Sequence, residues 1–186
     1  MIERKKTQIK QIVDSGAFSA WRLGIEIDIG KYCDYLHENA DWIEAGVALD
    51  VICPELPEEA AEKSFANWQY MRSRGLDPIP VYHARENIKW LYKYLDAGAT
   101  YIGLSASSLS HHNGEADTWY RIIWPHLVNA EGLPIVKTHA FGEGREHSLR
   151  NFPWYSSDSA SWLYAAQRTG EAQIDNKRKI SFRRDG

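Results

Sequence analysis

The sequence is poor in cysteine, and its two cysteines form no recognisable motif. Cys33 and Cys53 lie far apart in the chain of 186 residues, outside any Cys-x-x-Cys pair or Cys/His pattern with zinc spacing. This excludes a disulfide-rich scaffold and a zinc-finger type of site. We therefore expect two reduced, structural thiols in a cytoplasmic compartment.

Other signals are also missing. A Gly-x-Gly-x-x-Gly segment does not follow the first predicted strand, and no Gly-x-x-x-x-Gly-Lys-[Ser/Thr] loop occurs, which disfavours a nucleotide-cofactor fold. No signal peptide or membrane-length apolar run is present, so we expect no membrane partner. The formal charge of −3 provides no overall basic field for nucleic acid, although KRKISFRR (177–184) is locally basic.

Short apolar runs alternate with helical patterns along the chain. The runs are rich in Val, Ile and Tyr and mostly lack polar alternation, which predicts buried parallel strands at 10–14, 45–52, 79–83, 101–105, 134–141 and 154–159. The helical patterns cover 29–41, 56–75, 86–98, 115–132 and 159–168, and Pro125 should kink or shorten the fourth. Eight Trp and ten Tyr, mostly at helical spacing, favour packing over base stacking.

These units predict one α/β domain over residues 1–186, with a basic C-terminal hairpin or tail over about 170–186 that turns at Asn176. Six strand–helix units fit either an open doubly wound sheet or a TIM-like (β/α) barrel. The polar residues fall at the carboxyl ends of the strands, which favours the barrel.

Acidic and histidine side chains stand at several of these strand ends. In a parallel arrangement, Asp14, Asp50 and Asp158 would open on one face. His83 and His139 would join them there. Three carboxylates that share one face of a barrel cost free energy unless each has a role or a hydrogen-bond donor. Each Asp alone also suits a helix N-cap, and the Asp and His side chains together would suit a divalent metal ion.

The segment VDSGAFSAW (13–21) resembles the DSG-[GA]-[FY] segment of the tRNA-guanine transglycosylase family. The similarity is greater to the phage and bacterial branch that inserts 7-deazaguanines into DNA. ALDVI, PIPVYH, YIGLS, KTHAFG and PWYSSDSASW follow in the order and spacing of that branch, so the resemblance covers residues 10–165.

The resemblance implies a (β/α)8 barrel in which the six predicted strands correspond to the third through eighth. The first two strands and the family's zinc-binding Cys/His cluster have no counterpart. We therefore expect an incomplete barrel, completed by a second chain or a homo-oligomer, or left as a remnant.

The resemblance also implies a reaction that exchanges a base at C1′ through a covalent glycosyl-enzyme. Asp158 would be the nucleophile and Asp14 the general acid/base, without a cofactor or a metal. Asp50 would accept hydrogen bonds from a guanine-like base, and Phe18 would stack on it. The other expected base-pocket residues are Ser15, Gly16, His83, Gly103, Leu104 and His139.

A target nucleotide must leave its stack to enter such a pocket, so phosphate contacts are expected to hold the strand. The candidates are Arg145, Arg150, Arg168, Lys177, Arg178, Lys179, Arg183 and Arg184.

The sequence thus predicts a transglycosylase that replaces guanine in DNA with a 7-deazaguanine such as preQ0, in the bacterial host cytoplasm if the chain is encoded by a phage. A queuine-type enzyme acting on tRNA remains an alternative, as does a non-catalytic or complementing subunit of a split transglycosylase. A metal-dependent barrel hydrolase is less favoured, because no His-x-His pair ends the first strand.

Overall fold

The computed structural model describes residues 10–109, 114–160, 171–173 and 179–181. Its strands are β1 (Gln11–Val13), β2 (Ile43–Gly46), β3 (Val81–His83), β4 (Tyr101–Ser105), β5 (Lys137–Phe141), β6 (Ser156–Ser157), β7 (Glu171–Gln173) and β8 (Lys179–Ser181). Its helices are α1 (Ala17–Leu23), α2 (Ile29–Glu38), α3 (Pro57–Ser73), α4 (Lys89–Asp96), α5 (Glu115–Ile123), the 3-10 turn η1 (Trp124–His126) and α6 (Glu146–Asn151).

The strands β1 to β6 run parallel in chain order. β1 pairs with β2, and β3, β4, β5 and β6 form a second sheet. A parallel bridge between Val47 and Ile79 joins the two sheets, and the N–H of Ile79 donates to the carbonyl of Gly46 at 2.8 Å. The α/β class with a parallel sheet is therefore confirmed.

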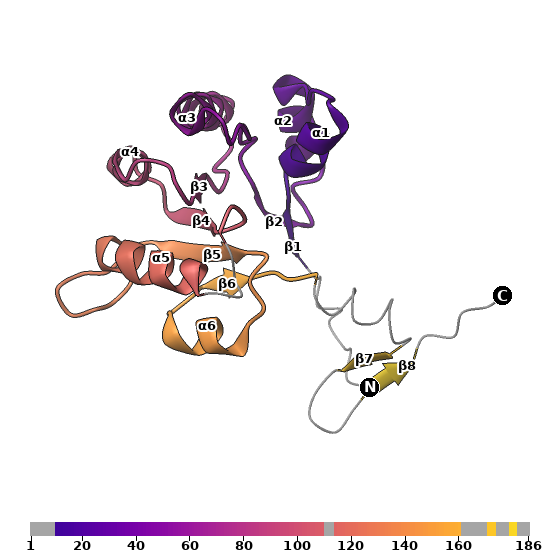
Figure 1. Ribbon diagram of the computed structural model, residues 1–186. Coiled ribbons are helices and arrows are strands. Elements are labelled where there is room, and N and C mark those ends of the chain that lie inside the picture. Colours follow the sequence, from indigo (N-terminus) through magenta and orange to yellow (C-terminus); the bar gives the residue numbers. More distant parts are fainter. Residues whose placement is uncertain (1–9, 110–113, 161–170, 174–178, 182–186) are drawn as a thin grey trace, which may run out of the picture.

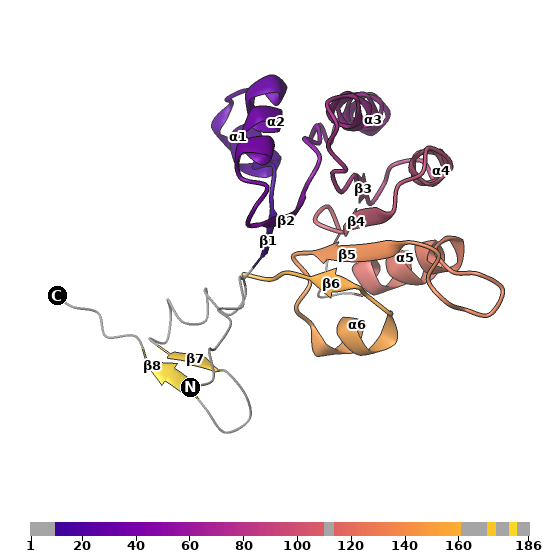
Figure 2. The ribbon, with the colours of Figure 1, turned by 180° about the vertical axis from the view of Figure 1, so that it is seen from behind.

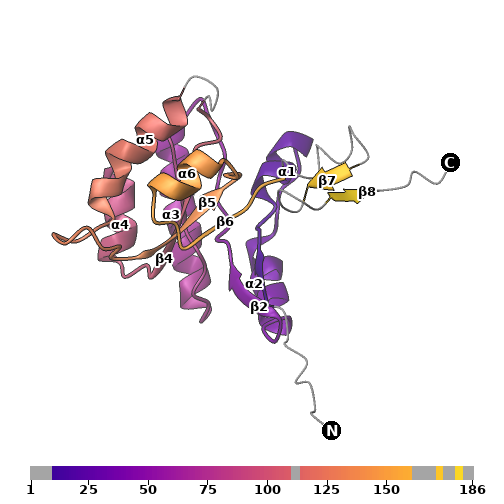
Figure 3. The same ribbon diagram turned by 90° about the horizontal axis from the view of Figure 1, so that it is seen from below.

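The helices lie outside the strands. Figure 1 shows α1 to α6 in an arc around β1 to β6, and Figure 2 shows the same arc from behind. Seen from below in Figure 3, α1 and α2 accompany β1 and β2, and α3 to α6 surround the remaining parallel strands. Helices thus cover one face of the parallel strands. β1 and β2 are less buried than their apolar runs predicted, whereas β4 is almost wholly buried.

Local sequence signals explain the helix ends. Pro57 opens α3, with Glu58 and Glu59 in its first turn and Arg72 in its last, which matches the charge preference of a helix dipole. As expected, α5 stops before Pro125 and continues only as η1.

Aromatic side chains fill the layer between helices and sheet. Trp68 and Tyr94 are almost wholly buried and meet edge to face, with ring centroids 5.3 Å apart. Trp154 packs in the same way on Trp124, at 4.8 Å. Most of the fully buried bulky residues are aromatic or aliphatic, so packing is the main use of the aromatics, as expected.

The structure differs from the sequence prediction at several elements. Helices α1 and α6 were not predicted, and β2 covers 43–46 instead of 45–52. The predicted helix 159–168 lies almost entirely outside the described residues. The C-terminal hairpin is confirmed, since β7 and β8 pair antiparallel with Gln173 opposite Lys179.

Two further expectations concern the cysteines and the possibility of a membrane span. Cys33 and Cys53 are both free thiols, Cys33 being buried. Within the described ranges, none of the helices has the length and apolar character needed to cross a membrane.

Candidate functional site

The turn after β1 carries Asp14 to the end of the sheet. β1 ends at Val13, and Gly16 adopts a left-handed backbone with φ of 75°, from which α1 starts at once. A side chain at Gly16 would strain this turn. The hydroxyl oxygen of Ser15 accepts the N–H of Ala17 at 3.3 Å, so the Asp-Ser-Gly segment is a tight strand-to-helix turn.

A cavity of about 200 Å³ opens at the carboxyl ends of the first five strands. Its polar lining comprises Asp14, Asp50, His83, Ser105 and Ser107, and its aromatic lining comprises Phe18 and Phe141. The structure therefore brings together Asp14, Asp50, His83 and Phe18, as the strand-end rule predicts.

Asp50 is held by two donors. The hydroxyl of Ser15 donates to its Oδ1 at 3.3 Å, and Nε2 of His83 lies 2.9 Å from its Oδ2. Burial alone would lower the pKa of His83, but the hydrogen bond and charge of Asp50, with the charge of Glu86, raise it above its ordinary value. His83 and Ser15 thus hold the Asp50 carboxyl group, whose oxygens each keep a lone pair for a further donor.

Asp158 lies just past β6 and is held from the neighbouring strand. Nε2 of His139 and the N–H of Gly142 lie 3.1 and 3.0 Å from its Oδ1. Among the described residues, no hydrogen bond reaches its Oδ2. The Asp158 side chain is 59% exposed, whereas that of His139 is only 5% exposed. A free oxygen of the carboxylate therefore faces solvent while the other is anchored.

A chain of hydrogen bonds continues behind His139. Its Nδ1 lies 2.5 Å from the hydroxyl of Ser156, which in turn bonds the hydroxyl of Tyr101. Since an ionised Asp158 only accepts, Nε2 of His139 carries the hydrogen of that bond. Ser156 thus links Tyr101 to the histidine that holds Asp158.

The pKa values of the Asp14 and Asp158 carboxyl groups are shifted in opposite directions. Burial raises the pKa of Asp14, and the charges of Asp50 and Asp158 raise it further against the backbone N–H groups of Ser15 and Gly16. The hydrogen bond from His139 lowers the pKa of Asp158, with help from the N–H of Gly142 and against burial. The protonated form is thus favoured more at Asp14 than at Asp158.

Five predicted pocket residues do not line the cavity. Ser15 and Gly16 form the turn after Asp14, and Ser15 supports Asp50 from there. Gly103 and Leu104 do not line the cavity: the N–H of Gly103 bonds the carbonyl of Pro80, and Leu104 is wholly buried. Their place is taken by Ser105 and Ser107, polar residues at the end of the same strand. His139 stands behind Asp158 instead of facing a base.

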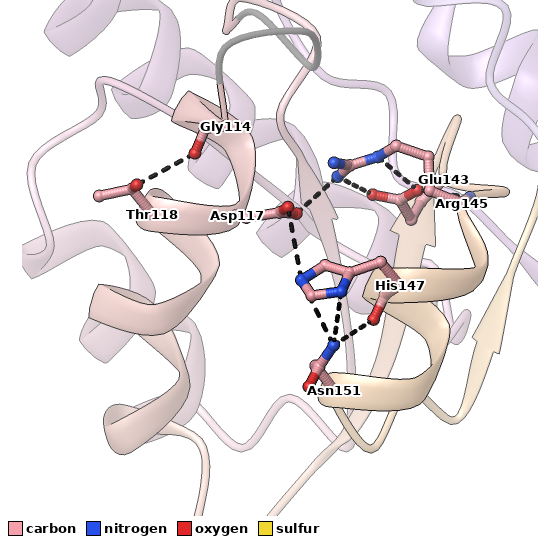
Figure 4. Close-up of polar contacts among 7 residues, drawn as sticks. All are labelled: Gly114, Asp117, Thr118, Glu143, Arg145, His147 and Asn151. Atoms are coloured by element: carbon pink, nitrogen blue, oxygen red, sulfur yellow. Dashed lines mark hydrogen bonds and ion pairs between the residues drawn. The ribbon is translucent and has the colours of Figure 1, made fainter.

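Arg145 belongs to an ion-pair cluster that Figure 4 shows between α5 and the loop after β5. Its guanidinium contacts Glu143 at 2.5 Å and Asp117 at 2.8 Å, and Glu143 is 1% exposed. Two carboxylates already balance this charge, so we do not retain Arg145 among the phosphate contacts. The cluster instead anchors the loop whose Gly142 donates to Asp158.

The other basic candidates are less constrained. Arg150 pairs with Glu146, and both side chains are exposed. Lys179 lies in β8. The remaining candidates lie outside the described residues: Arg168, Lys177, Arg178, Arg183 and Arg184.

The residues that the structure describes contain no group of three or more His, Cys, Asp or Glu side chains arranged to hold a metal ion. His83 and His139 each point a ring nitrogen at a different carboxylate, so they do not converge on a common point with Asp14. The geometry does not favour the metal-hydrolase alternative.

Comparisons of the chain with protein-family models, curated proteins and solved structures give no match. The transglycosylase resemblance therefore rests on the sequence motifs and stays a prediction.

Proposed function

We propose that this protein is a base-exchange transglycosylase that replaces guanine in DNA with a 7-deazaguanine such as preQ0. The observation that carries the proposal is the placement of two carboxyl groups: Asp14 lines the cavity, and Asp158 is held at its edge by the N–H of Gly142, which also lines it. Their pKa values are shifted in opposite directions, upward for Asp14 and downward for Asp158. Retaining glycosyl transfer needs this pair: an ionised carboxylate that attacks and a protonated one that serves the leaving group.

In the first step, the free Oδ2 of Asp158 attacks C1′ of the target nucleotide. The C1′–N9 bond breaks, its electrons go to the departing guanine, and Asp14 gives that base its proton. A covalent glycosyl–Asp158 ester remains. The anchoring of Oδ1 by His139 and Gly142 holds the nucleophile in position while Oδ2 reacts.

In the second step, a 7-deazaguanine takes the place of guanine. Asp14, now ionised, removes the proton from N9 of the incoming base, and N9 attacks C1′. The ester bond breaks and its electrons return to Asp158, which restores both carboxyls. No cofactor and no metal is required by this balance.

The base would be recognised by the polar wall of the cavity. The free lone pairs of Asp50 accept the N1–H and amino hydrogens of a guanine-like base, and Ser15 and His83 hold that carboxylate in place. Phe18 lines the same cavity and offers a ring for stacking. Guanine and 7-deazaguanines share this hydrogen-bonding edge, so one pocket serves both bases.

We further propose that the six parallel strands are part of a (β/α) barrel that a second copy or another chain completes. The parallel order and the cavity at the strand ends support a barrel wall. Among the described residues, β1 pairs only with β2 and β6 only with β5, which leaves two strand edges to be covered. This arrangement also keeps the split-enzyme alternative open.

The proposal is tested by incorporation of labelled guanine or preQ0 into duplex DNA and, in parallel, into tRNA. We expect label in DNA, and its loss in Asp158→Asn and in Asp14→Asn. Asp96→Asn, at the exposed end of α4, is the matched control and should retain activity. Label in tRNA alone would change the substrate, and no label in either polymer from folded protein would overturn the proposal.

A further inference from the structure

A second pocket of about 260 Å³ adjoins the proposed base cavity. The two share part of their lining, namely Phe18, Ile52, His83 and Ser107. We call the second one the flanking pocket. Because the walls are common, a polymer seated in the first cavity would pass directly along the second.

Exposed aromatic side chains form one wall of the flanking pocket. Phe18 is 50% exposed and Trp21 is 46% exposed, and both belong to α1. Their ring centroids lie 5.9 Å apart with the planes tilted by 39°, so the rings are not stacked face to face on each other. Large aromatic rings that are exposed beside a pocket can stack on a flat apolar group of a ligand.

The lining of the flanking pocket also includes a positive charge, that of Arg85. Among the described residues its guanidinium makes no ion pair or hydrogen bond. Its backbone is left-handed, with φ of 81°, a conformation that is unfavourable for a residue other than glycine. The turn is fixed on either side: Ala84 donates its N–H to the carbonyl of Ser105, and Tyr82 donates its hydroxyl to the carbonyl of Glu86.

Glu86 is the acidic member of the lining, and it opposes Arg85 only weakly near neutral pH. Its carboxylate accepts the backbone N–H of His83 at 3.2 Å. Burial raises the pKa of Glu86 to about 7, so the group carries only part of a charge there. The flanking pocket therefore combines two aromatic rings with one available cation.

We propose that the flanking pocket binds the nucleobase next to the exchanged nucleotide, stacked on Trp21, with the intervening phosphate on Arg85. This inference rests on the proposed function. A ring for a base and a cation for a phosphate are the two contacts by which single-stranded nucleic acid is held. Continuity with the base cavity selects this occupant over a free aromatic molecule, which would have no use for the unpaired Arg85.

The inference predicts that the protein senses the neighbour of its target. We would measure exchange on oligonucleotides that carry an abasic residue immediately 5′ or 3′ of the target guanine. For the wild-type protein, an abasic residue on one side, and not on the other, should raise KM about tenfold, as loss of one stacked base does. Trp21→Ala should show the raised KM on the intact strand and no further effect of the abasic residue.

Arg85→Asn removes the charge and keeps a residue that tolerates the left-handed backbone. It should raise KM about tenfold with kcat nearly unchanged, because the phosphate contact is made in the ground state as well. Tyr35→Ala, an exposed aromatic on α2, and Arg121→Asn on α5 are the matched controls and should behave like the wild-type protein.

A second readout separates this inference from the proposed function. A 2-aminopurine base at the neighbouring position should lose fluorescence when the strand binds, and Trp21→Ala should abolish that loss whether or not exchange occurs. Exchange with equal KM on intact and abasic strands would overturn the inference and leave the proposed function standing. Absence of exchange, with quenching that depends on Trp21, would overturn the function and keep a nucleobase site.

Discussion

The substitution Gly103→Ala distinguishes two roles for a residue in the middle of β4. The family resemblance assigns this glycine to the base pocket, whereas the structure packs the ring of Phe141 against it. A Cβ built on Gly103 would lie 2.2 Å from Cε2 of Phe141, well inside the 3.4 Å at which ordinary contact begins. The ring, which is half-buried and lines the cavity, would have to withdraw by about 1 Å from its packed position.

Overpacking of this kind costs about 1–3 kcal/mol of stability. We expect Gly103→Ala to lower the free energy of unfolding by that amount, measured by urea denaturation. With a denaturant slope of about 2 kcal/mol per molar, the midpoint should fall by about 1 M. Gly46→Ala is the matched strand control, because its Cβ would meet only the flexible end of Leu36, at 2.8 Å.

The decisive measurement is a double-mutant cycle with Phe141→Ala. If the clash causes the loss, Gly103→Ala should cost almost nothing once the ring is gone, and the coupling energy should match the single-mutant loss. An equal loss in both backgrounds would refute the packing argument. An unchanged stability with impaired base binding would return Gly103 to the pocket.

Three further predictions follow from the site. Arg145→Met should lower the free energy of unfolding by about 3–5 kcal/mol in urea denaturation, because Glu143 would stay buried without a counter-charge. Asp14→Asn should raise the thermal midpoint at neutral pH, since the ionised form of Asp14 is disfavoured in the folded state; the gain should vanish as the pH falls and Asp14 becomes protonated. His139→Leu should move the acidic limb of the kcat/KM profile to higher pH, because Asp158 loses the hydrogen bond that lowers its pKa.

Each of these has a contrary outcome. A loss in Arg145→Met no larger than in Arg150→Met, whose partner is exposed, would contradict the argument from burial. A gain in Asp14→Asn that persists in acid would point to a cause other than charge. A pH profile of unchanged shape in His139→Leu would reduce His139 to a packing residue.

The sequence predicted the elements whose signals are local. The capping charges and Pro57 located α3, and the apolar run at 101–105 coincides with β4. β2 was misplaced because the apolar run after it continues outside the sheet. There the N–H of Leu49 meets the sulfur of Met71 and the N–H of Val51 donates to Ser64, so α3 covers residues that the pattern assigned to a strand. Helices α1 and α6 are too short for their periodicity to be read.

The residues of the candidate site were likewise predictable only where their signal is local in the sequence. The end of a parallel strand is visible in the sequence, and this located Asp14, Asp50 and His83. Gly103 and Ser105 lie on the same face of β4, but the ring of Phe141 covers Gly103. This cover is not visible in the sequence, so Gly103 was assigned to the pocket in place of Ser105. The partners of Arg145 come from two elements, and only the folded chain brings them together.

The three carboxylates at the strand ends differ in what holds them, and this difference supports the roles that we propose for them. Asp50 has a side-chain donor on each oxygen, and Asp158 has His139 and a backbone N–H on one oxygen. Only backbone N–H groups assist Asp14, which faces the charges of both other acids. Because neighbouring like charges disfavour ionisation, the pKa is raised at the carboxyl group with the weakest donors. The acid that can give up a proton is thereby fixed by the donors around its neighbours, and removal of His139 should weaken that asymmetry without touching Asp14.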